Sequence, residues 1–374
     1  MREVCAELGV EPVINACGPV TVYGGSLMPP EVVEAMASAS RAFVDMHELH
    51  LAAGKRIAAL VGAEAAHVCA GAAAGIALMA AACMAGSDPK RIAQLPDTSG
   101  MKHLFVAQRA HRNGFYQSVR LAGGRFLEVG VDVTELKMAL GPEVAAIYHT
   151  AAAFSQGEEL PLPQVAELAH AAGLPVLVDA AAQLPPAENL TRFLKEGGDL
   201  VTFSGGKALR GPQSSGLIIG RADLIEACRL NDCPNMSVGR PMKASKEDIA
   251  GLVKAVELYV KKDHAAEMAL WEGRVARMIE ALSGLAHVRV WRTFPYGVAQ
   301  QVPVAVVSWD ETALGLTHEE AARRLLQGQP RVAVRLLAPD ADYTADTPEL
   351  RLYPDQLQEG EEVAVAARLR ELLL

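Results

Sequence analysis

Short runs of β-branched and apolar residues alternate with helical stretches over residues 103–220, and this alternation constrains the fold more than any other feature of the chain. The runs are HLFVAQ at 103, RFLEVG at 125, VAAIYHT at 144, PVLVDA at 175, DLVTFSG at 199 and SGLIIG at 215. Helical periodicity separates them, for example over residues 114–122 and 163–172. The pattern predicts an α/β fold with a mostly parallel sheet covered on both faces. In such a sheet, ligands bind at the carboxyl ends of the strands.

Three regions are expected along the chain. Residues 1–50 read as an N-terminal helical arm and residues 51–262 as the large, ligand-binding domain. From Ser245 a long helical pattern, opened by a capping signature of Ser245 and Asp248, is predicted to connect to a second domain. Residues 263–374 alternate strands and helices on a smaller scale, which predicts a small C-terminal α+β domain.

The charge balance disfavours nucleic acid as a partner. The 374 residues include 35 Lys and Arg against 44 Asp and Glu, which gives a net charge of -9, and the basic residues are scattered. A composition with 51% hydrophobic and 21% charged residues is that of an enzyme-sized folded protein rather than of a disordered chain.

Cysteine usage and the apolar segments favour a cytoplasmic protein. The six cysteines form neither a CxxC pair nor a block with zinc-ligand spacing, so reduced thiols and no metal site are expected. The N-terminal MREVCAELGV lacks the features of a signal peptide, and no export is predicted. The uncharged stretch of residues 68–86 is mainly Ala and Gly, which predicts a helix buried within the protein rather than a membrane span.

The segment DLVTFSGGKALRGPQSSGLIIG places Lys207 in a glycine-rich turn after a strand. A lysine facing a dry pocket at a strand end can form a Schiff base, because desolvation lowers its pKa. A solvated lysine in a surface turn is the competing interpretation. The spacing of a nucleotide-binding P-loop is absent, because Ala208 follows Lys207 where Ser or Thr is required.

Asp179 ends the apolar strand PVLVDA, 28 residues before Lys207. Alone, such a carboxylate is a helix cap, a metal ligand or the partner of a cofactor cation. Together with Lys207 it matches pyridoxal phosphate, which needs a lysine for the aldimine and a carboxylate to keep its pyridine nitrogen protonated. A third element is the small-residue turn Gly71, Ala72 and Ala73, whose unhindered N–H groups at a helix start suit a phosphate.

These elements occur in the order found in fold type I pyridoxal phosphate enzymes, and the chain resembles the selenocysteine synthase-like (SelA-like) group among them. That group includes D-glucosaminate-6-phosphate ammonia lyase. The resemblance covers most of the first 260 residues, whereas the C-terminal third matches only loosely. It rests on VINACGPVTVYGGSLMPPEV at 13, ALVGAEAAHVCAGAAAG at 59, HRNGF at 111, PVLVDAAAQLPP at 175, VTFSGGKALRGPQSSGLIIGR at 201 and SVGRPMKASKEDIAGLVKAVE at 237.

The resemblance implies a role for each matching residue. Lys207 would be the aldimine lysine and Asp179 the partner of the pyridine nitrogen. The turn Gly71, Ala72 and Ala73, together with Ser204, would bind the phosphate, and His111 and Gln183 would lie near the ring. Because family members are dimers or larger assemblies with sites at subunit interfaces, the segment 237–243, with Gly239 and Arg240, is expected to reach the cofactor of a neighbouring subunit.

The substrate is expected to be a small amino acid or amino sugar acid. Arg335, Arg351 and Arg240 are candidates for binding its carboxylate, although an outward-facing arginine in a strand is as good an interpretation. The favoured reaction is α,β-elimination with release of ammonia. Racemisation or epimerisation, transamination, and a non-catalytic scaffold that binds the cofactor remain the alternatives.

Overall fold

The computed structural model describes residues 2–151, 159–294, 300–337 and 347–374, which form two compact units. The larger unit consists mainly of Leu27–Lys262. The smaller one consists of the described residues of Met1–Ser26, Asp263–Tyr296 and Gln301–Leu374. The arm expected over residues 1–50 is thus divided between the units, because strand β1 (Ile14–Ala16) pairs with a strand of the C-terminal third.

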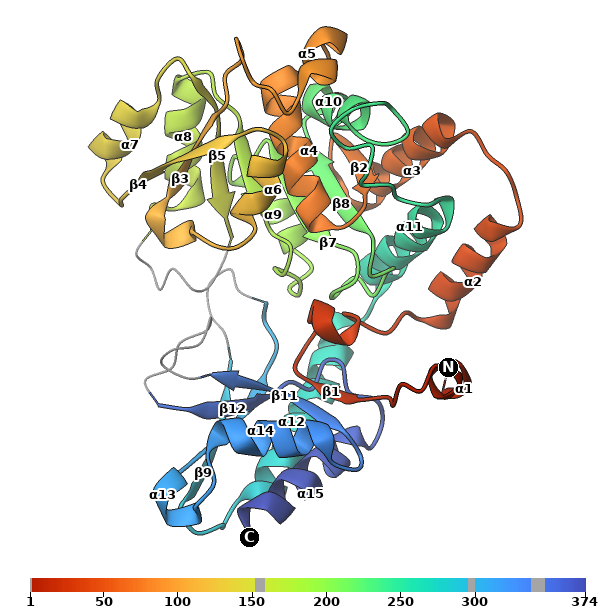
Figure 1. Cartoon of the computed structure of the whole chain (residues 1–374), viewed down its shortest axis with the longest axis vertical. Helices are drawn as coiled ribbons and strands as arrows, with labels where there is room; N and C mark the ends of the chain where they lie inside the picture. The colour runs from red at the N-terminus through yellow and green to blue at the C-terminus, as the bar shows by residue number, and fades with distance from the viewer. Residues whose placement is uncertain (1, 152–158, 295–299, 338–346) are drawn as a thin grey trace. The chain divides into compact units, whose positions relative to one another are not determined.

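A seven-stranded sheet forms the centre of the larger unit (Figure 1). All six strands predicted over residues 103–220 are present, and the fold is a mostly parallel α/β sheet as expected. Only β8 runs antiparallel to its two neighbours, and one of these, β2, was not predicted. In spatial order the strands are β2 (Ala65–Cys69), β8 (Gly216–Gly220), β7 (Leu200–Ser204), β6 (Val176–Asp179), β5 (Val144–Thr150), β3 (Leu104–Gln108) and β4 (Arg125–Val129).

Both faces of this sheet are buried, because successive strand residues point to opposite sides. In β6, Val176 and Val178 enter one apolar cluster and Leu177 enters the other. The first cluster includes residues of α3 (Met46–Val61), α7 (Val133–Ala139), α8 (Leu162–Ala171), α9 (Asn189–Lys195) and α11 (Lys246–Lys261). The second includes residues of α4 (Ala72–Ala85), α6 (Tyr116–Leu121) and α10 (Ala222–Asn231). The unit also contains α2 (Pro30–Ser40), α5 (Pro89–Gln94) and the 3-10 turn η2 (Arg109–His111).

Helix α4 is the buried helix that the sequence predicted over the uncharged stretch. It lies across one face of the sheet (Figure 1), and twelve of its residues are buried. Among the described residues, no helix combines the length and the apolar character that crossing a membrane requires.

The long helical pattern after Ser245 is two helices rather than one. Ser245 and Asp248 form the predicted capping box at the start of α11. That helix ends at Lys261, and Asp263 caps the next helix, α12 (His264–Leu282), by accepting the N–H of Ala266. The boundary between the two compact units falls at this break.

The smaller unit is built on a five-stranded sheet, as expected for a small α+β domain. Leu350 and Leu352 point into its core, whereas Arg351 between them points to the opposite face. The spatial order is β1, β11 (Val332–Leu337), β12 (Glu349–Leu352), β10 (Val304–Trp309) and β9 (Val288–Thr293). Its helices are α12, α14 (His318–Gln327) and α15 (Glu361–Leu373), with short α1 (Arg2–Glu7), η1 (Thr21–Tyr23) and α13 (Glu311–Leu314).

Candidate functional site

The carboxylate of Asp179 is buried at the carboxyl end of β6. Its Oδ1 accepts a hydrogen bond of 3.0 Å from the N–H of Ala181, and its Oδ2 accepts one of 3.1 Å from the Tyr148 hydroxyl. Burial raises the pKa of Asp179, whereas these hydrogen bonds and the positive charge of Lys207 lower it. Because Lys207 influences this pKa, its ammonium lies within electrostatic range of the carboxylate.

Lys207 stands on a tight turn that joins β7 to β8. The N–H of Gly205 donates to the carbonyl of Ser215 at 2.9 Å. A Cβ on Gly205 would lie 2.0 Å from Ser215 Oγ, and a Cβ on Gly206 would lie 2.6 Å from Gln213 Cα. These positions have no room for a side chain, so the close packing of the turn fixes the backbone at Lys207.

The small-residue turn Gly71–Ala73 begins α4, as the sequence predicts. Gly71 is the N-cap with a φ of 89°, and no side chain of the described residues caps the helix. The first N–H groups of α4 are therefore available to an anion. Gly216 pairs with Cys69 on one side and with Ser204 on the other, which brings Ser204 to the strand ends beside this turn.

His111 follows β3 and is completely buried. Its Nδ1 accepts the N–H of Thr150 at 3.2 Å, and its Nε2 lies 2.5 Å from a carboxylate oxygen of Glu159. The ring of His149 meets it edge-on, with 4.5 Å between centroids. Because Thr150 is opposite Asp179 in the pairing of β5 with β6, His111 lies beside the same edge of the sheet as Asp179.

The side chains of His111, His149 and Glu159 have the spacing of a metal site, although none was expected from the sequence. Their donor atoms all lie within 4.8 Å of one another. However, Nδ1 of His111 accepts a hydrogen bond from Thr150, so its proton is on Nε2, which donates to Glu159. A protonated Nε2 cannot coordinate a metal. We therefore assign these side chains to a hydrogen-bonded cluster.

Two buried histidines are expected to make the free energy of unfolding depend on pH. Burial lowers the pKa of His149 and that of His50 from 6.5 to about 3. Each therefore binds its proton more readily in the unfolded chain, so stability is highest above pH 6.5 and falls on acidification towards pH 3. Between these limits each group contributes at most about 1.4 kcal/mol per pH unit.

Denaturant titrations at several values between about pH 5.5 and 7.5 measure this slope. His50→Gln and His149→Gln should each reduce the pH dependence of the free energy of unfolding by the contribution of up to one bound proton, because glutamine does not titrate. An unchanged slope in both variants would contradict the prediction.

The residues at these strand ends fit pyridoxal phosphate. Lys207 offers an amine, Asp179 a buried carboxylate suited to a protonated pyridine nitrogen, and the Gly71–Ala73 turn an anion site. Gln183 adds a buried side-chain oxygen, Oε1, that has no hydrogen-bond partner among the described residues. The buried Nδ1 of His149 likewise has no hydrogen-bond partner among the described residues. A buried polar atom without a partner calls for an explanation, and a bound cofactor would supply one.

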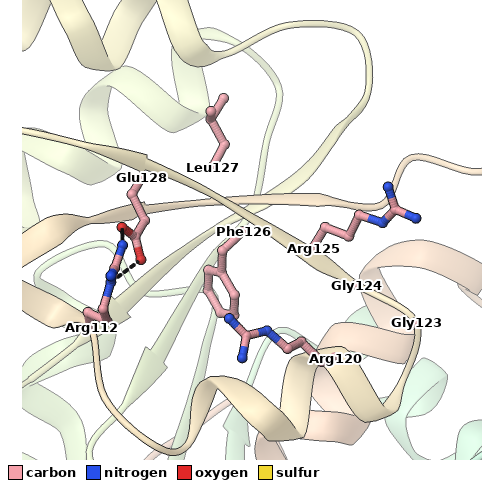
Figure 2. Close-up of a pocket in the computed structure, with 8 residues that line it drawn as sticks. All are labelled: Arg112, Arg120, Gly123, Gly124, Arg125, Phe126, Leu127 and Glu128. Carbon is pink, nitrogen blue, oxygen red and sulfur yellow. Dashed lines mark hydrogen bonds and ion pairs between the residues drawn. The ribbon is translucent and has the colours of Figure 1, made fainter.

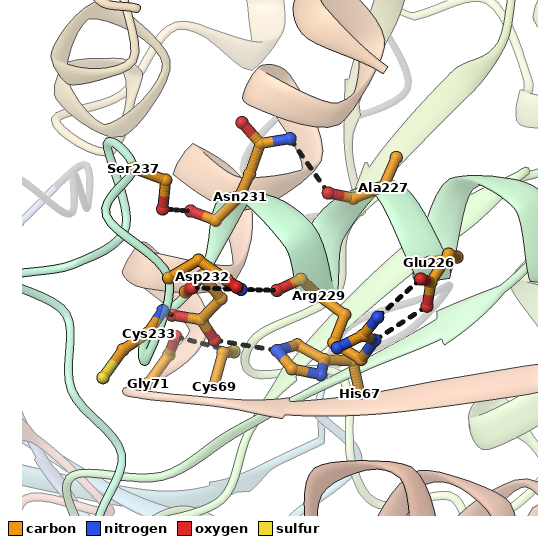
Figure 3. Close-up of polar contacts among 11 residues, drawn as sticks. His67, Cys69, Gly71, Glu226, Ala227, Arg229, Asn231, Asp232, Cys233 and Ser237 are labelled. Atoms are coloured by element: carbon orange, nitrogen blue, oxygen red, sulfur yellow. Dashed lines mark hydrogen bonds and ion pairs between the residues drawn. The ribbon is translucent and has the colours of Figure 1, made fainter. Parts of the chain in front are cut away.

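The predicted subunit-spanning residues Gly239 and Arg240 lie on the loop that follows α10. Asp232, at the start of this loop, ties it to His67 of β2 (Figure 3). Nε2 of His67 lies 2.7 Å from Oδ2 of Asp232, and both side chains are buried. A Cβ on Gly239 would lie 2.4 Å from the carbonyl oxygen of Asn231, so only glycine fits there. Arg240 is exposed to solvent.

Arg335 and Arg351 belong to the smaller unit, where they are directly opposite each other in the pairing of β11 with β12. Arg351 is paired with the carboxylate of Glu349, at 2.6 Å. Glu349 therefore neutralises the charge of Arg351. Arg335 lies over the ring of Tyr353, with its guanidinium carbon 5.0 Å from the centroid. The pKa of Cys17 is raised, because burial outweighs the opposing effects of the positive charge of Arg335 and of a hydrogen bond with it.

Sequence reasoning missed Tyr148, Glu159, Cys17 and Tyr353. One feature of the sequence could have pointed to Tyr148: it brings a hydroxyl into VAAIY, a run whose other residues are apolar. Cys17 lies in VINACGPV, part of the resemblance, but nothing in the sequence joined it to Arg335. Glu159 and Tyr353 had no signal, because each is far in sequence from its partner.

A pocket lined by three arginines lies along β4, the edge strand of the large sheet (Figure 2). Arg112 points to Glu128 and forms an ion pair with it. Arg125 extends away from that pair, and Arg120 lies beside Phe126. None of the predicted site residues lines this pocket.

Comparisons with known proteins identify relatives of this chain. A family model described as SelA, L-seryl-tRNA selenium transferase, matches residues 119–284. A 5'-C-glycyluridine monooxygenase-decarboxylase from a Streptomyces species is 33% identical, over 98% of this chain and 91% of that protein. The D-glucosaminate-6-phosphate ammonia lyase of Salmonella typhimurium is 31% identical, over 98% of this chain and 96% of that protein.

Solved structures extend the comparison to the fold. A structure of D-glucosaminate-6-phosphate ammonia-lyase matches with a TM-score of 0.85 at 31% identity, covering 99% of this chain and 98% of that one. A structure of SPT with a PLP internal aldimine matches with a TM-score of 0.61 at 15% identity, covering 96% and 87%, which is a likeness of fold alone. The chain therefore belongs to the SelA-like group of fold type I enzymes, and it acts on a small molecule with pyridoxal phosphate as cofactor.

Proposed function

We propose that this enzyme is an ammonia lyase that eliminates a leaving group from the β-carbon of an amino acid or amino sugar acid. The observation that carries the proposal is the pair of Lys207 and buried Asp179 at one edge of the sheet. The elimination itself is supported by the near full-length similarity to an ammonia lyase.

The cofactor would be held by groups from four strand ends. Pyridoxal phosphate, when bound, supplies an electron sink that stabilises negative charge on the α-carbon of the substrate. Lys207 would carry it, and Asp179 would accept a hydrogen bond from its ring nitrogen. The N–H groups of Gly71–Ala73 and the hydroxyl of Ser204 would bind its phosphate. His111 and Gln183 would lie beside its ring.

Lys207 would also move the protons. Its neutral amine takes the α-proton of the substrate and becomes an ammonium, which can return that proton to the departing group at the β-carbon. The unsaturated amine that remains adds water and loses ammonia, which leaves a 2-keto acid. Burial raises the pKa of Asp179, and its two hydrogen bonds and the charge of Lys207 oppose that rise, so these contacts favour the carboxylate that a protonated ring nitrogen needs.

The phosphate assignment predicts a cofactor-binding defect in Gly216→Ala. The new Cβ would lie 2.4 Å from the carbonyl carbon of Gly71, so the turn that offers its N–H groups to the phosphate has to shift. We expect the dissociation constant for pyridoxal phosphate, measured from its absorbance, to rise by at least about tenfold, as for one lost charge-assisted hydrogen bond. Gly141→Ala is the matched control, because nothing lies within 4 Å of its Cβ. Equal dissociation constants in the two variants would contradict the assignment.

Arg335 is proposed to bind the substrate carboxylate, with Arg351 and Arg240 as weaker candidates. Its support is the planar guanidinium, which can bind a carboxylate through two parallel hydrogen bonds. We further propose a homodimer or larger homo-oligomer in which Gly239 and Arg240 reach a neighbouring site.

We also propose a cytoplasmic location. This location is supported by the six cysteines, all of which are free thiols.

The test is an assay of the holoenzyme on amino acids that carry β-leaving groups, in the absence of oxygen. Release of ammonia and keto acid in equal amounts supports the lyase. Exchange of the α-proton without ammonia would instead indicate a racemase or epimerase, and turnover only with an added keto acid an aminotransferase.

A second candidate is oxidative decarboxylation of an amino acid, which the 33% identity to a monooxygenase-decarboxylase favours. It predicts that product forms only with oxygen and that carbon dioxide is released. The same panel, run with and without oxygen, separates the two reactions.

A further inference from the structure

Strand β4 is an edge of the large sheet, and one row of its backbone groups has no strand beside it. Among the described strands, β4 pairs only with β3. The N–H of Arg125 donates to the carbonyl of His103 at 2.9 Å, and the next residue in a strand turns its N–H and C=O to the other side. The N–H and C=O of Phe126 therefore point outward from the sheet. An unpaired edge of this kind is a template for an added strand.

The pocket along β4 has positive charge on both faces of this edge (Figure 2). Its volume is about 650 Å³, and residues 125–128 of the strand line it. Val129 enters one apolar cluster and Phe126 packs against the other, so their side chains mark opposite faces of the sheet. Arg125 shares the face of Val129, because residues an even number apart in a strand point the same way. Arg120 lies beside Phe126, on the other face.

The charges of Arg120 and Arg125 are not neutralised within the described part of the chain. Neither guanidinium forms a hydrogen bond or an ion pair there, whereas the third arginine of the pocket, Arg112, is paired with Glu128. Because the net charge of the chain is -9, these two cations do not reflect a general excess of basic residues. The pocket is therefore complementary in charge to a ligand that carries carboxylates.

We propose that β4 binds an extended acidic segment of another protein as an added strand. The backbone of that segment pairs with the N–H and C=O of Phe126, and carboxylates on its two faces meet Arg125 and Arg120. Leu127, which is 39% exposed, adds an apolar contact. The residues that would hold pyridoxal phosphate do not line this pocket, so the inference does not depend on the reaction proposed above.

The test measures the binding of labelled peptides to the holoenzyme by fluorescence anisotropy. The probe is the heptapeptide Val-Thr-Glu-Glu-Thr-Val-Thr, whose two adjacent carboxylates point to opposite faces of an extended chain. We expect it to bind at least about tenfold more tightly than the same peptide with Gln in place of Glu. The double variant Arg120→Gln, Arg125→Gln should lower the affinity for the acidic peptide by about tenfold. Arg41→Gln is the matched control, because it removes the same charge from an exposed arginine at the end of α2.

Two further peptides test the pairing of the backbone. One carries N-methyl groups on the odd-numbered amides of the probe and the other on the even-numbered amides. Because only one of these two sets can face β4 in an added strand, methylation of one set should abolish binding and methylation of the other should not. Equal affinities of the two methylated peptides would contradict the proposal.

Sedimentation of the same variants separates this role from two others. Arginines on an edge strand can also serve to keep the edges of like molecules apart. In that case the double variant would self-associate while its affinity for the acidic peptide stayed unchanged. A double variant with fewer subunits than the unaltered holoenzyme would instead assign the edge to a second copy of this chain. Either result, or an unaltered holoenzyme that does not prefer the acidic peptide, would overturn the proposal.

The catalytic properties of the double variant show whether it is correctly folded. Arg120 and Arg125 are exposed and lie outside the residues proposed to hold the cofactor, so turnover, Tm and the affinity for pyridoxal phosphate should all be unchanged. A loss of peptide binding with these properties intact is then a property of the β4 edge.

Discussion

Lys207→Ala is expected to abolish turnover and covalent attachment of the cofactor. Loss of a positioned acid–base group alone lowers rates by about 10²–10⁴-fold, and here the same residue would also carry the cofactor. Borohydride reduction followed by peptide mass mapping should find a pyridoxyl group on the peptide that contains Lys207, and none in the variant.

Lys102→Ala is the matched control, because Lys102 is an exposed lysine of the same unit. It should retain both turnover and the labelled peptide. A pyridoxyl group on another lysine of the unaltered protein would remove Lys207 from the proposed mechanism.

Asp179→Asn should lower kcat/KM by about 10²-fold or more without destabilising the fold. The loss follows because an amide cannot stabilise a protonated ring nitrogen as a carboxylate does. Stability should not fall, because burial raises the pKa of Asp179 and so disfavours its charged form in the folded protein. Steady-state kinetics and denaturant unfolding measure the two effects separately.

Tyr148→Phe is the control for this prediction. It removes the 3.1 Å hydrogen bond to Oδ2 of Asp179 but keeps the carboxylate, so turnover should stay within about tenfold of the unaltered enzyme. If Tyr148→Phe were as damaging as Asp179→Asn, the hydrogen bond rather than the charge would be the important feature.

Local pattern was enough to predict the large sheet. Strands β3 to β8 are mainly apolar runs of four to seven residues bounded by turn residues, and each was found where the pattern predicted it. Strand β2 was missed because AAHVC is followed after only two residues by the alanine-rich helix α4, so the two read as one small-residue segment. Strand β1 has only three residues, and its pairing with β11 depends on a partner more than 300 residues away.

The break between α11 and α12 shows a limit of periodicity. Residues 245–282 keep one helical pattern, yet Asp263 caps a new helix by accepting the N–H of Ala266. The charged residues around the break fit the polar face of a continuous helix equally well, so the hydrophobic pattern does not reveal it.

The sequence by itself determined the chemistry of the site: a lysine in a glycine-rich turn, an acid at a strand end and a small-residue turn at a helix start. Each is local, because spacing along one strand or turn decides where these groups stand. Only the tertiary structure decided which groups meet. It set Tyr148 against Asp179, joined His111 to Glu159 and used Glu349 to occupy Arg351. The first two of these contacts depend on strand order, and all three on side-chain direction, which no local pattern of residues specifies.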